Sequence, residues 1–233
     1  FMIGMFHWWM VEYYGPIVIV DREISLNASE AELYAPRSSF DECINFICDC
    51  LDKAIEYLPA RQQNIKWYGR ATSAAAYAFK ARVLLFAASP LFNGNAKFYA
   101  DLKNHDGKAL VNTKYDPEKW KRAMDAAEEA IQFCEQNGYA LYKNAANGTL
   151  DTFERGVADF HDQLVEMRYN DVEFLWAFCH NNSQEELQKR SGIRTTTPYS
   201  TNGWLTNFQV LFPAVESYYT KNGLPLEDDP LTK

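Results

Sequence analysis

The alanine-rich stretch at residues 68–95 constrains this chain most. Its eight alanines occupy positions 71, 74, 75, 76, 78, 81, 87 and 88. Alanine has the highest helix propensity and loses no side-chain entropy in a helix. Thr72 or Ser73 can cap the start of this helix, and Pro90 ends it. Because neighbouring helices can approach so smooth a surface closely, we predict that residues 70–89 form the central helix of an all-helical layer.

A strongly patterned helix precedes this stretch. Ser39 and Glu42 have the spacing of a capping box, in which each side chain satisfies a free N–H at the helix start. Apolar residues then recur at i, i+3, i+4 and i+7, the pattern of one buried face, until Pro59 ends it. Residues 60–69 link this helix to the alanine-rich one. We therefore expect the two helices to form an antiparallel pair.

A similar helix follows the stretch. Asp116 and Pro117 suit its N-cap and first position, and Gly138 suits its end. Segments 48–58 and 124–134 align at an offset of 76 residues, with Asp, Ala and Ile at matching positions. This similarity is typical of tetratricopeptide-type helix pairs whose period is lengthened by insertions. We also predict helices at residues 2–14, 151–166 and 208–221, an extended run at 17–20, and a short buried strand at 171–179.

Composition excludes several classes of protein. The net charge of −8 argues against a nucleic-acid binder, which would present a basic face. No apolar run reaches the roughly 20 residues of a membrane span. The five cysteines and four histidines lack disulfide or metal-ligand spacing, and no motif for a nucleophile, phosphate loop or dinucleotide occurs. The sequence therefore predicts no catalytic residue, no metal and no cofactor, and it predicts that the cysteines are small buried residues.

Aromatic residues make up 15% of the chain. Trp8, Trp9 and Trp120 fall on helical positions and are expected in the core. Trp67 and Trp204 fall instead in loops beside Asn, Arg and Thr. The alternative for these two is that a loop tryptophan folds back onto the core.

Loop aromatics of this kind suit carbohydrate. A ring stacks on the apolar face of a sugar, while amides and guanidinium groups bind the hydroxyls. On this hypothesis Trp204 and Tyr199 are the stacking platforms, Arg194 and Asn202 are their polar partners, and Trp67 is a further contact.

Several segments resemble one family. GRATSAAAYAFKARVLLFAASPLFNGN (69–95) is similar to the signature helix of the SusD/RagB family, with its GRAT-like entry, its KARVLL and its AASPLFNG-like exit. The family's other motifs follow in order, as YYGPIVIV (13–20), YDPEKWKRAMDAAEEAI (115–131), VEFLWAF (172–178) and SYYTKNGLPLEDD (217–229). One departure is LTNFQ at 205–209, where the family usually has a polar PTQ.

The resemblance implies a fold and a role. The fold would be mainly α, with tetratricopeptide-like helix pairs, long irregular loops and little strand. The role would be that of a surface-exposed lipoprotein of the outer membrane in Bacteroidetes-type bacteria. Such a protein binds a glycan, or a peptide in some members, without cleaving it, and delivers it to a SusC-like TonB-dependent transporter. In this family the alanine-rich helix is scaffold, the helix pairs face the transporter, and variable loops contact the ligand.

The resemblance also implies a domain organisation. We expect residues 1–233 to be part of one SusD-like domain, with a helical-repeat layer at 1–166 and a loop-rich ligand-side segment at 167–233. Both ends of the full protein, including the lipid anchor, are expected to lie outside this chain.

Three alternatives stay open. One is a tetratricopeptide-type scaffold that binds only protein, and another is a peptide-binding member of the same family. The third is a glycoside hydrolase, which would need two carboxylates at a defined separation in one cleft. No such pair stands out in the sequence.

Overall fold

The computed structural model describes residues 1–165, 172–177, 217–220 and 222–230. It forms two compact units. One unit comprises Phe1–Tyr142 and Met167–Ala177, and the other comprises Lys143–Glu166 and Phe178–Lys233. The regular structure in the described residues is helical, and the only pairing between extended segments there is two isolated bridges, Lys103 with Ala109 and Tyr219 with Pro225. The predicted mainly α fold is confirmed.

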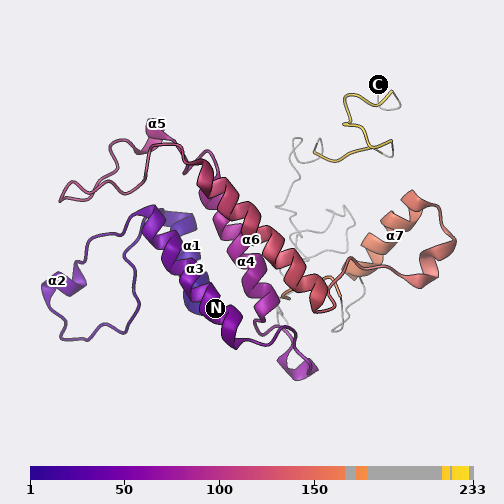
Figure 1. The fold of residues 1–233 in the computed structure, drawn as a ribbon, viewed down its shortest axis with the longest axis horizontal. Helices are drawn as coiled ribbons and strands as arrows, with labels where there is room; N and C mark the ends of the chain where they lie inside the picture. Colours follow the sequence, from indigo (N-terminus) through magenta and orange to yellow (C-terminus); the bar gives the residue numbers. More distant parts are fainter. Residues whose placement is uncertain (166–171, 178–216, 221, 231–233) are drawn as a thin grey trace, which may run out of the picture. The chain divides into compact units, whose positions relative to one another are not determined.

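Four helices build the first unit. Helix α4 (Ser73–Ala88) packs against α3 (Phe40–Tyr57) on one side and α6 (Pro117–Gln136) on the other, while α1 (Met2–Tyr14) packs against α3 (Figure 1). The alanine-rich helix is therefore central, as predicted. Ala74, Ala76 and Ala88 are fully buried. Since small side chains let backbones approach closely, they fit this central position.

The helix ends follow the sequence signals. The Thr72 side chain accepts a hydrogen bond from Ala75 N–H at the start of α4, and Ser39 and Glu42 form a complete capping box at the start of α3. Asp116 caps α6. At the other end of α6, Gly138 adopts a φ of 77° and its N–H donates to Glu135 C=O. This left-handed conformation favours glycine at the end of a helix.

Two of the three core tryptophans were predicted wrongly. Trp8 is buried, but Trp9 and Trp120 are exposed by 42% and 41%. Helix α6 carries two apolar stripes, and the one that faces inward consists of small residues, namely Ala123, Ala126, Ala130 and Cys134. The larger residues, Trp120, Met124 and Ile131, lie outside. Close packing against the alanine-rich α4 selects the small stripe, because large side chains would hold the two helices apart.

Helix α1 is apolar on its outward face as well. Trp8 and Val11 are buried, while Met2, Phe6 and Tyr13 are exposed.

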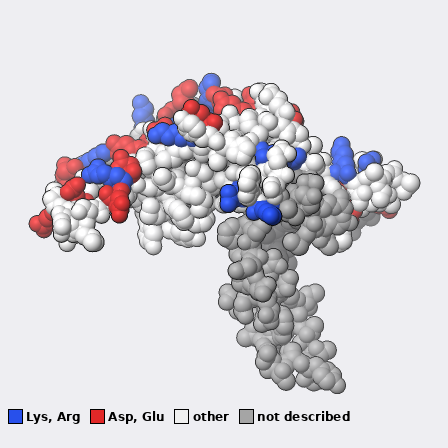
Figure 2. All heavy atoms as spheres, turned by 90° about the horizontal axis from the view of Figure 1, so that it is seen from below, with Lys and Arg blue, Asp and Glu red and all other residues white. Residues whose placement is uncertain are grey.

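Figure 2 shows charged side chains gathered along one edge of the larger described surface, with a broad uncharged area beside them. Within the described residues, no helix is both long and apolar enough to cross a membrane.

Other predictions fail in the connections. Residues 172–177 are irregular rather than a buried strand, and Phe174 is exposed. Residues 217–220, predicted to end a helix, form a turn and a bridge. The loops also contain short helices that we did not predict, namely α2 (Glu30–Leu33), η1 (Ile65–Trp67) and α5 (Ala96–Tyr99). A capping box at Ser29 and Glu32, which the sequence shows, starts α2.

The second unit contains η2 (Ala145–Thr149) and α7 (Thr152–Val165), close to the helix predicted at 151–166. The side chains of Asn144 and Asn147 both donate to Asp162, which links the two elements. Of the neighbouring acids Asp228 and Asp229, the second is buried. Asp229 is 1% exposed, and its carboxylate accepts from the Asn222 side chain at 3.0 Å.

Candidate functional site

The described candidate site lies in the connection between α3 and α4. Backbone and side-chain hydrogen bonds close this connection tightly. Ser73 N–H donates to Pro59 C=O at 2.9 Å, and the Gln62 side chain donates to Ala71 C=O at 3.1 Å. Within the loop, Trp67 ends the 3₁₀ turn η1. The loop is thus internally bonded, so its exposed side chains are held at defined places.

Residues 172–177 lie against this loop. The Trp176 indole N–H donates to Gly69 C=O at 2.8 Å, and the Thr72 hydroxyl donates to Leu175 C=O at 3.4 Å. The Trp176 ring also meets Phe1 edge-on, with ring centroids 5.2 Å apart. Although residues 172–177 form no strand, they fix one wall of the site.

A hollow lies between the loop and residues 172–177. Its volume is about 390 Å³, including the solvent at its mouth. Aromatic, guanidinium and amide side chains line it together, among them Arg61, Gln62, Tyr68, Arg70, Tyr139 and Phe174. Trp67 adjoins this group because the Arg70 guanidinium lies over its ring. We call this group, with Trp67 and Trp176, the turn site.

Both arginines of the turn site lie over aromatic rings. The Arg61 guanidinium carbon is 4.1 Å from the ring centroid of Tyr139, and that of Arg70 is 5.7 Å from the ring of Trp67. The Tyr139 hydroxyl donates to Ala60 C=O at 3.2 Å. A cation over a ring is attracted to the negative face of the π system. These contacts orient the guanidinium groups and leave their N–H edges as planar hydrogen-bond donors.

The turn site suits a ligand with both apolar and hydroxyl surfaces. Trp67 is 47% exposed. An exposed indole offers a flat face on which a sugar ring can stack, and adjacent guanidinium N–H groups can donate to hydroxyl oxygens. No cluster of three metal-binding side chains occurs within the described residues. The rings and guanidinium groups of the turn site offer stacking and hydrogen bonding.

Three of the four cysteines that the structure describes are buried, as the sequence predicts for small apolar residues. Cys43, Cys48 and Cys134 are buried, while Cys50 is half-buried. Burial raises the pKa of the Cys48 thiol to about 11, so this thiol stays protonated at neutral pH. A protonated thiol is a poor nucleophile.

The structure places only one of the predicted site residues. Trp67 lies exposed in the turn site. Arg194, Tyr199, Asn202 and Trp204 lie outside the described residues. Sequence reasoning missed Arg61, Arg70, Tyr139 and Phe174. Arg70 directly follows Gly69 and its positive φ of 86°, a local signal, whereas the Arg61–Tyr139 contact joins residues distant in sequence.

Comparison with known proteins gives one family match. Residues 1–85 match a SusD-like family described as starch-binding and associating with the outer membrane. A search of curated proteins found no match.

Solved structures extend this likeness over most of the chain. BT4246 superposes with a TM-score of 0.80 at 29% identity, covering 99% of this chain and 42% of its own. Its selenomethionine form gives a TM-score of 0.70, at 29% identity over 98% of this chain and 41% of its own. A SusD-like protein from Bacteroides fragilis NCTC 9343 is 24% identical over 74% of this chain and 24% of its own, with a TM-score of 0.47.

The chain thus spans about two fifths of the length of the BT4246 structures that it matches. The family match at residues 1–85 covers α1, α3 and most of α4. The helix predicted from the GRAT segment begins within that range and ends three residues beyond it, and the structural match to BT4246 covers 99% of the chain. The resemblance stated from the sequence is confirmed: residues 1–85 match the SusD-like family model, and almost the whole chain is similar in structure to BT4246.

Proposed function

We propose that this chain binds oligosaccharide at the cell surface without cleaving it. The observation that carries the proposal is the turn site, where an exposed indole stands beside a guanidinium group 5.7 Å from its ring. The described association of the family with starch and the outer membrane supports the same class of ligand. Affinity is expected to be weak, because water competes for each hydroxyl of the sugar.

The proposal extends to the rest of the binding surface. Trp204 and Tyr199 would supply further platforms, with Arg194 and Asn202 as polar partners. These residues belong to the sequence hypothesis and are tested in the same way as Trp67. Replacement of Trp204 by alanine is expected to abolish glycan binding while the helical circular dichroism signal stays unchanged.

We further propose that the bound glycan passes to a SusC-like TonB-dependent transporter, and that a lipid anchor outside this chain holds the protein at the outer membrane. Support comes from the family's association with the outer membrane. The measurement is co-purification of a SusC-like transporter with this protein, with glycan uptake as the functional readout. Uptake that continues unchanged when the gene is deleted would contradict this role.

The test of the turn site is Trp67→Ala. Removing the ring takes away the stacking surface and the partner of Arg70, so affinity should fall by about tenfold or more. The measurement is isothermal calorimetry with neutral oligosaccharides, beginning with maltohexaose. The matched control is Trp120→Ala, because Trp120 is exposed to a similar extent, 41% against 47%, and lies on α6.

Three outcomes decide the proposal. If Trp67→Ala weakens binding and Trp120→Ala does not, the turn site is the contact surface. If both variants bind as well as the parent, the assignment of Trp67 is wrong. If the parent binds no oligosaccharide in the panel, the proposed function itself fails.

A further inference from the structure

A second hollow lies at the opposite end of α3. It is formed by residues 33–37, which precede the N-terminus of α3, and by residues 103–106 of the connection between α4 and α6. Its volume is about 1120 Å³, including the solvent at its mouth. Tyr34, Arg37, Lys103, Asn104, His105 and Asp106 line it together with Leu33, Ala35 and Pro36. We call it the cap hollow.

The walls of the cap hollow are held by the protein's own bonds. The Asn104 side chain donates to Arg37 C=O at 2.8 Å, which joins the two walls directly. Ser38 N–H donates to Ile17 C=O at 2.8 Å. Lys108 N–H donates to the Asp106 carboxylate at 2.9 Å, and Lys103 pairs with Ala109 in an isolated bridge. The hollow is therefore formed before any ligand enters it.

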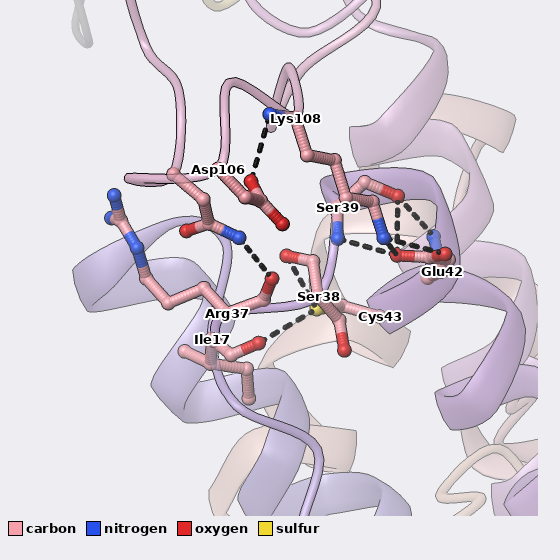
Figure 3. Close-up of polar contacts among 9 residues, drawn as sticks. Ile17, Arg37, Ser38, Ser39, Glu42, Cys43, Asp106 and Lys108 are labelled. Atoms are coloured by element: carbon pink, nitrogen blue, oxygen red, sulfur yellow. Dashed lines mark hydrogen bonds and ion pairs between the residues drawn. The ribbon is translucent and has the colours of Figure 1, made fainter. Parts of the chain in front are cut away.

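The cations that line the cap hollow differ from those around it. Arg22 pairs with Glu32 at 3.2 Å, and Lys108 pairs with Glu42 at 2.7 Å, both within the same part of the fold. Arg37 and Lys103 make no ion pair with any residue that the structure describes. Figure 3 shows the Arg37 guanidinium extending away from the capping box, while Lys108 turns toward Glu42.

This arrangement leaves positive charge uncompensated in a chain of net charge −8. One carboxylate lines the cap hollow, that of Asp106, and one of its oxygens already accepts from Lys108 N–H. A guanidinium group presents a planar fork of donors that matches the oxygens of a carboxylate or sulfate. Tyr34, which is 77% exposed, adds an aromatic face beside these cations.

We propose that the cap hollow binds an anionic sugar unit, one that bears a carboxylate or a sulfate. Arg37 and Lys103 bind the anionic group, and Tyr34 stacks on the sugar ring. This inference rests on the proposed function in taking a glycan as the ligand, but it concerns a separate place. The turn site follows the C-terminus of α3 and the cap hollow precedes its N-terminus, so a helix of about 27 Å lies between them.

The test compares acidic with neutral ligands. Isothermal calorimetry is run with oligogalacturonate for the carboxylate, a heparin oligosaccharide for the sulfate, and maltohexaose as the neutral probe. In the double variant Arg37→Gln/Lys103→Gln, affinity for at least one acidic ligand should fall by about tenfold or more, while maltohexaose binding stays unchanged. The acidic ligand that responds identifies the anionic group.

The matched control is Arg82→Gln/Lys53→Gln. Both residues are exposed, and both lie on helices away from the cap hollow. This control removes the same formal charge, so it separates a local contact from a general change in the field of the protein. Tyr34→Ala is an independent variant that keeps the charge. It should weaken the binding of acidic ligands that stack on the Tyr34 ring. Equal melting temperatures for all variants show that folding is intact.

Each outcome has a meaning. Acidic binding that the double variant leaves unchanged overturns the inference, and so does an equal loss for acidic and neutral ligands. Loss of acidic binding in the control as well as the double variant also overturns it. If the parent binds maltohexaose through Trp67 but binds neither acidic ligand, the inference fails and the proposed function stands. If the binding of acidic ligands depends on Arg37 and Lys103 while neutral ligands do not bind, the proposed role of the turn site is wrong and the inference stands.

Discussion

The turn site and the cap hollow, at the two ends of the α3–α4 pair, differ in what contacts their cationic side chains. At the turn site, Arg61 and Arg70 lie over Tyr139 and Trp67, so the protein's own rings already hold the guanidinium groups. At the cap hollow, no described acidic side chain pairs with Arg37 or Lys103. The same residue types are thus held differently at the two ends, and on our proposals this suits them to different ligands.

The physical reason is the state of each charge before a ligand arrives. A guanidinium group on an aromatic face keeps its in-plane donors but is oriented by the ring, which suits neutral hydroxyl oxygens. A guanidinium group with no partner gains most from an anion, because charge-assisted hydrogen bonds are about twice as strong as neutral ones. On our proposals, the turn site therefore takes neutral sugars by stacking, and the cap hollow takes acidic ones.

The largest predicted effect is a loss of stability that weakens binding at both the turn site and the cap hollow. Leu51 is completely buried in α3, within the core between the two sites. Leu51→Ala leaves a cavity and should lower the free energy of unfolding by about 2 to 5 kcal/mol. Denaturant unfolding followed by circular dichroism measures the loss.

The control is Leu85→Ala, because Leu85 is 55% exposed on α4. It should change the free energy of unfolding by less than about 0.5 kcal/mol. A smaller loss for Leu51→Ala than for Leu85→Ala would show that the core between the two ends does not stabilise this unit. In partly unfolded Leu51→Ala, neutral and acidic ligands should lose apparent affinity by the same factor.

A smaller effect should separate the two ends. Trp176→Phe keeps an aromatic ring near Phe1 but removes the indole N–H that donates to Gly69 C=O at 2.8 Å. Loss of this hydrogen bond should lower the free energy of unfolding by about 1 kcal/mol. Because the bond fixes one wall of the turn site, maltohexaose should bind several-fold more weakly while acidic ligands bind as before.

Two measurements complete this test. Trp120→Phe is the control, since Trp120 is an exposed tryptophan of α6 away from residues 172–177. Calorimetry with the neutral and acidic probes is then compared between the two variants. An equal loss of both ligands in Trp176→Phe would mean that the two ends are coupled and that the comparison is wrong.

Local signals explain what the sequence predicted correctly. The capping box at Ser39, the N-cap at Asp116 and the glycine at 138 each act within a few residues, and each helix end follows them. The alanine-rich helix was predicted as central because its composition permits close approach. The exposure of Trp120 was not predicted, because the sequence does not show which of the two apolar stripes on α6 faces α4.

The candidate site was less predictable than the fold. Trp67 could be assigned to a loop, but its neighbours come from distant parts of the chain. Tyr139 lies beyond α6, and Trp176 lies beyond residue 142, yet both contact the loop at 58–72. The apolar run at 171–179, of which the structure describes 172–177, was predicted as a strand because short buried strands and irregular packed segments share that pattern.

The smallest predicted effect concerns the frame of the cap hollow. The hydrogen bond from Lys108, followed by those from Ser39, lowers the pKa of Glu42 to about 2. A carboxylate whose pKa is depressed by folding stabilises the folded state fully above its unfolded pKa, and this contribution is lost as pH falls from about 4.5 toward 2. Since the Glu42 side chain is 51% exposed, solvent screening should keep the contribution below about 1 kcal/mol.

The variant Lys108→Met isolates this contribution. Denaturant unfolding at pH 5 and pH 2.5 gives the loss of unfolding free energy on acidification. Every other carboxylate of the chain also contributes to this loss. Lys108→Met removes the largest cause of the Glu42 shift, so its loss between the two pH values should be smaller than that of the parent. Lys53→Met, on the exposed face of α3, should match the parent. If Lys108→Met also matches the parent, the Lys108–Glu42 pair does not stabilise this wall. The rigidity of the cap hollow would then depend on Asn104 and its bond to Arg37 C=O, which Asn104→Ala removes.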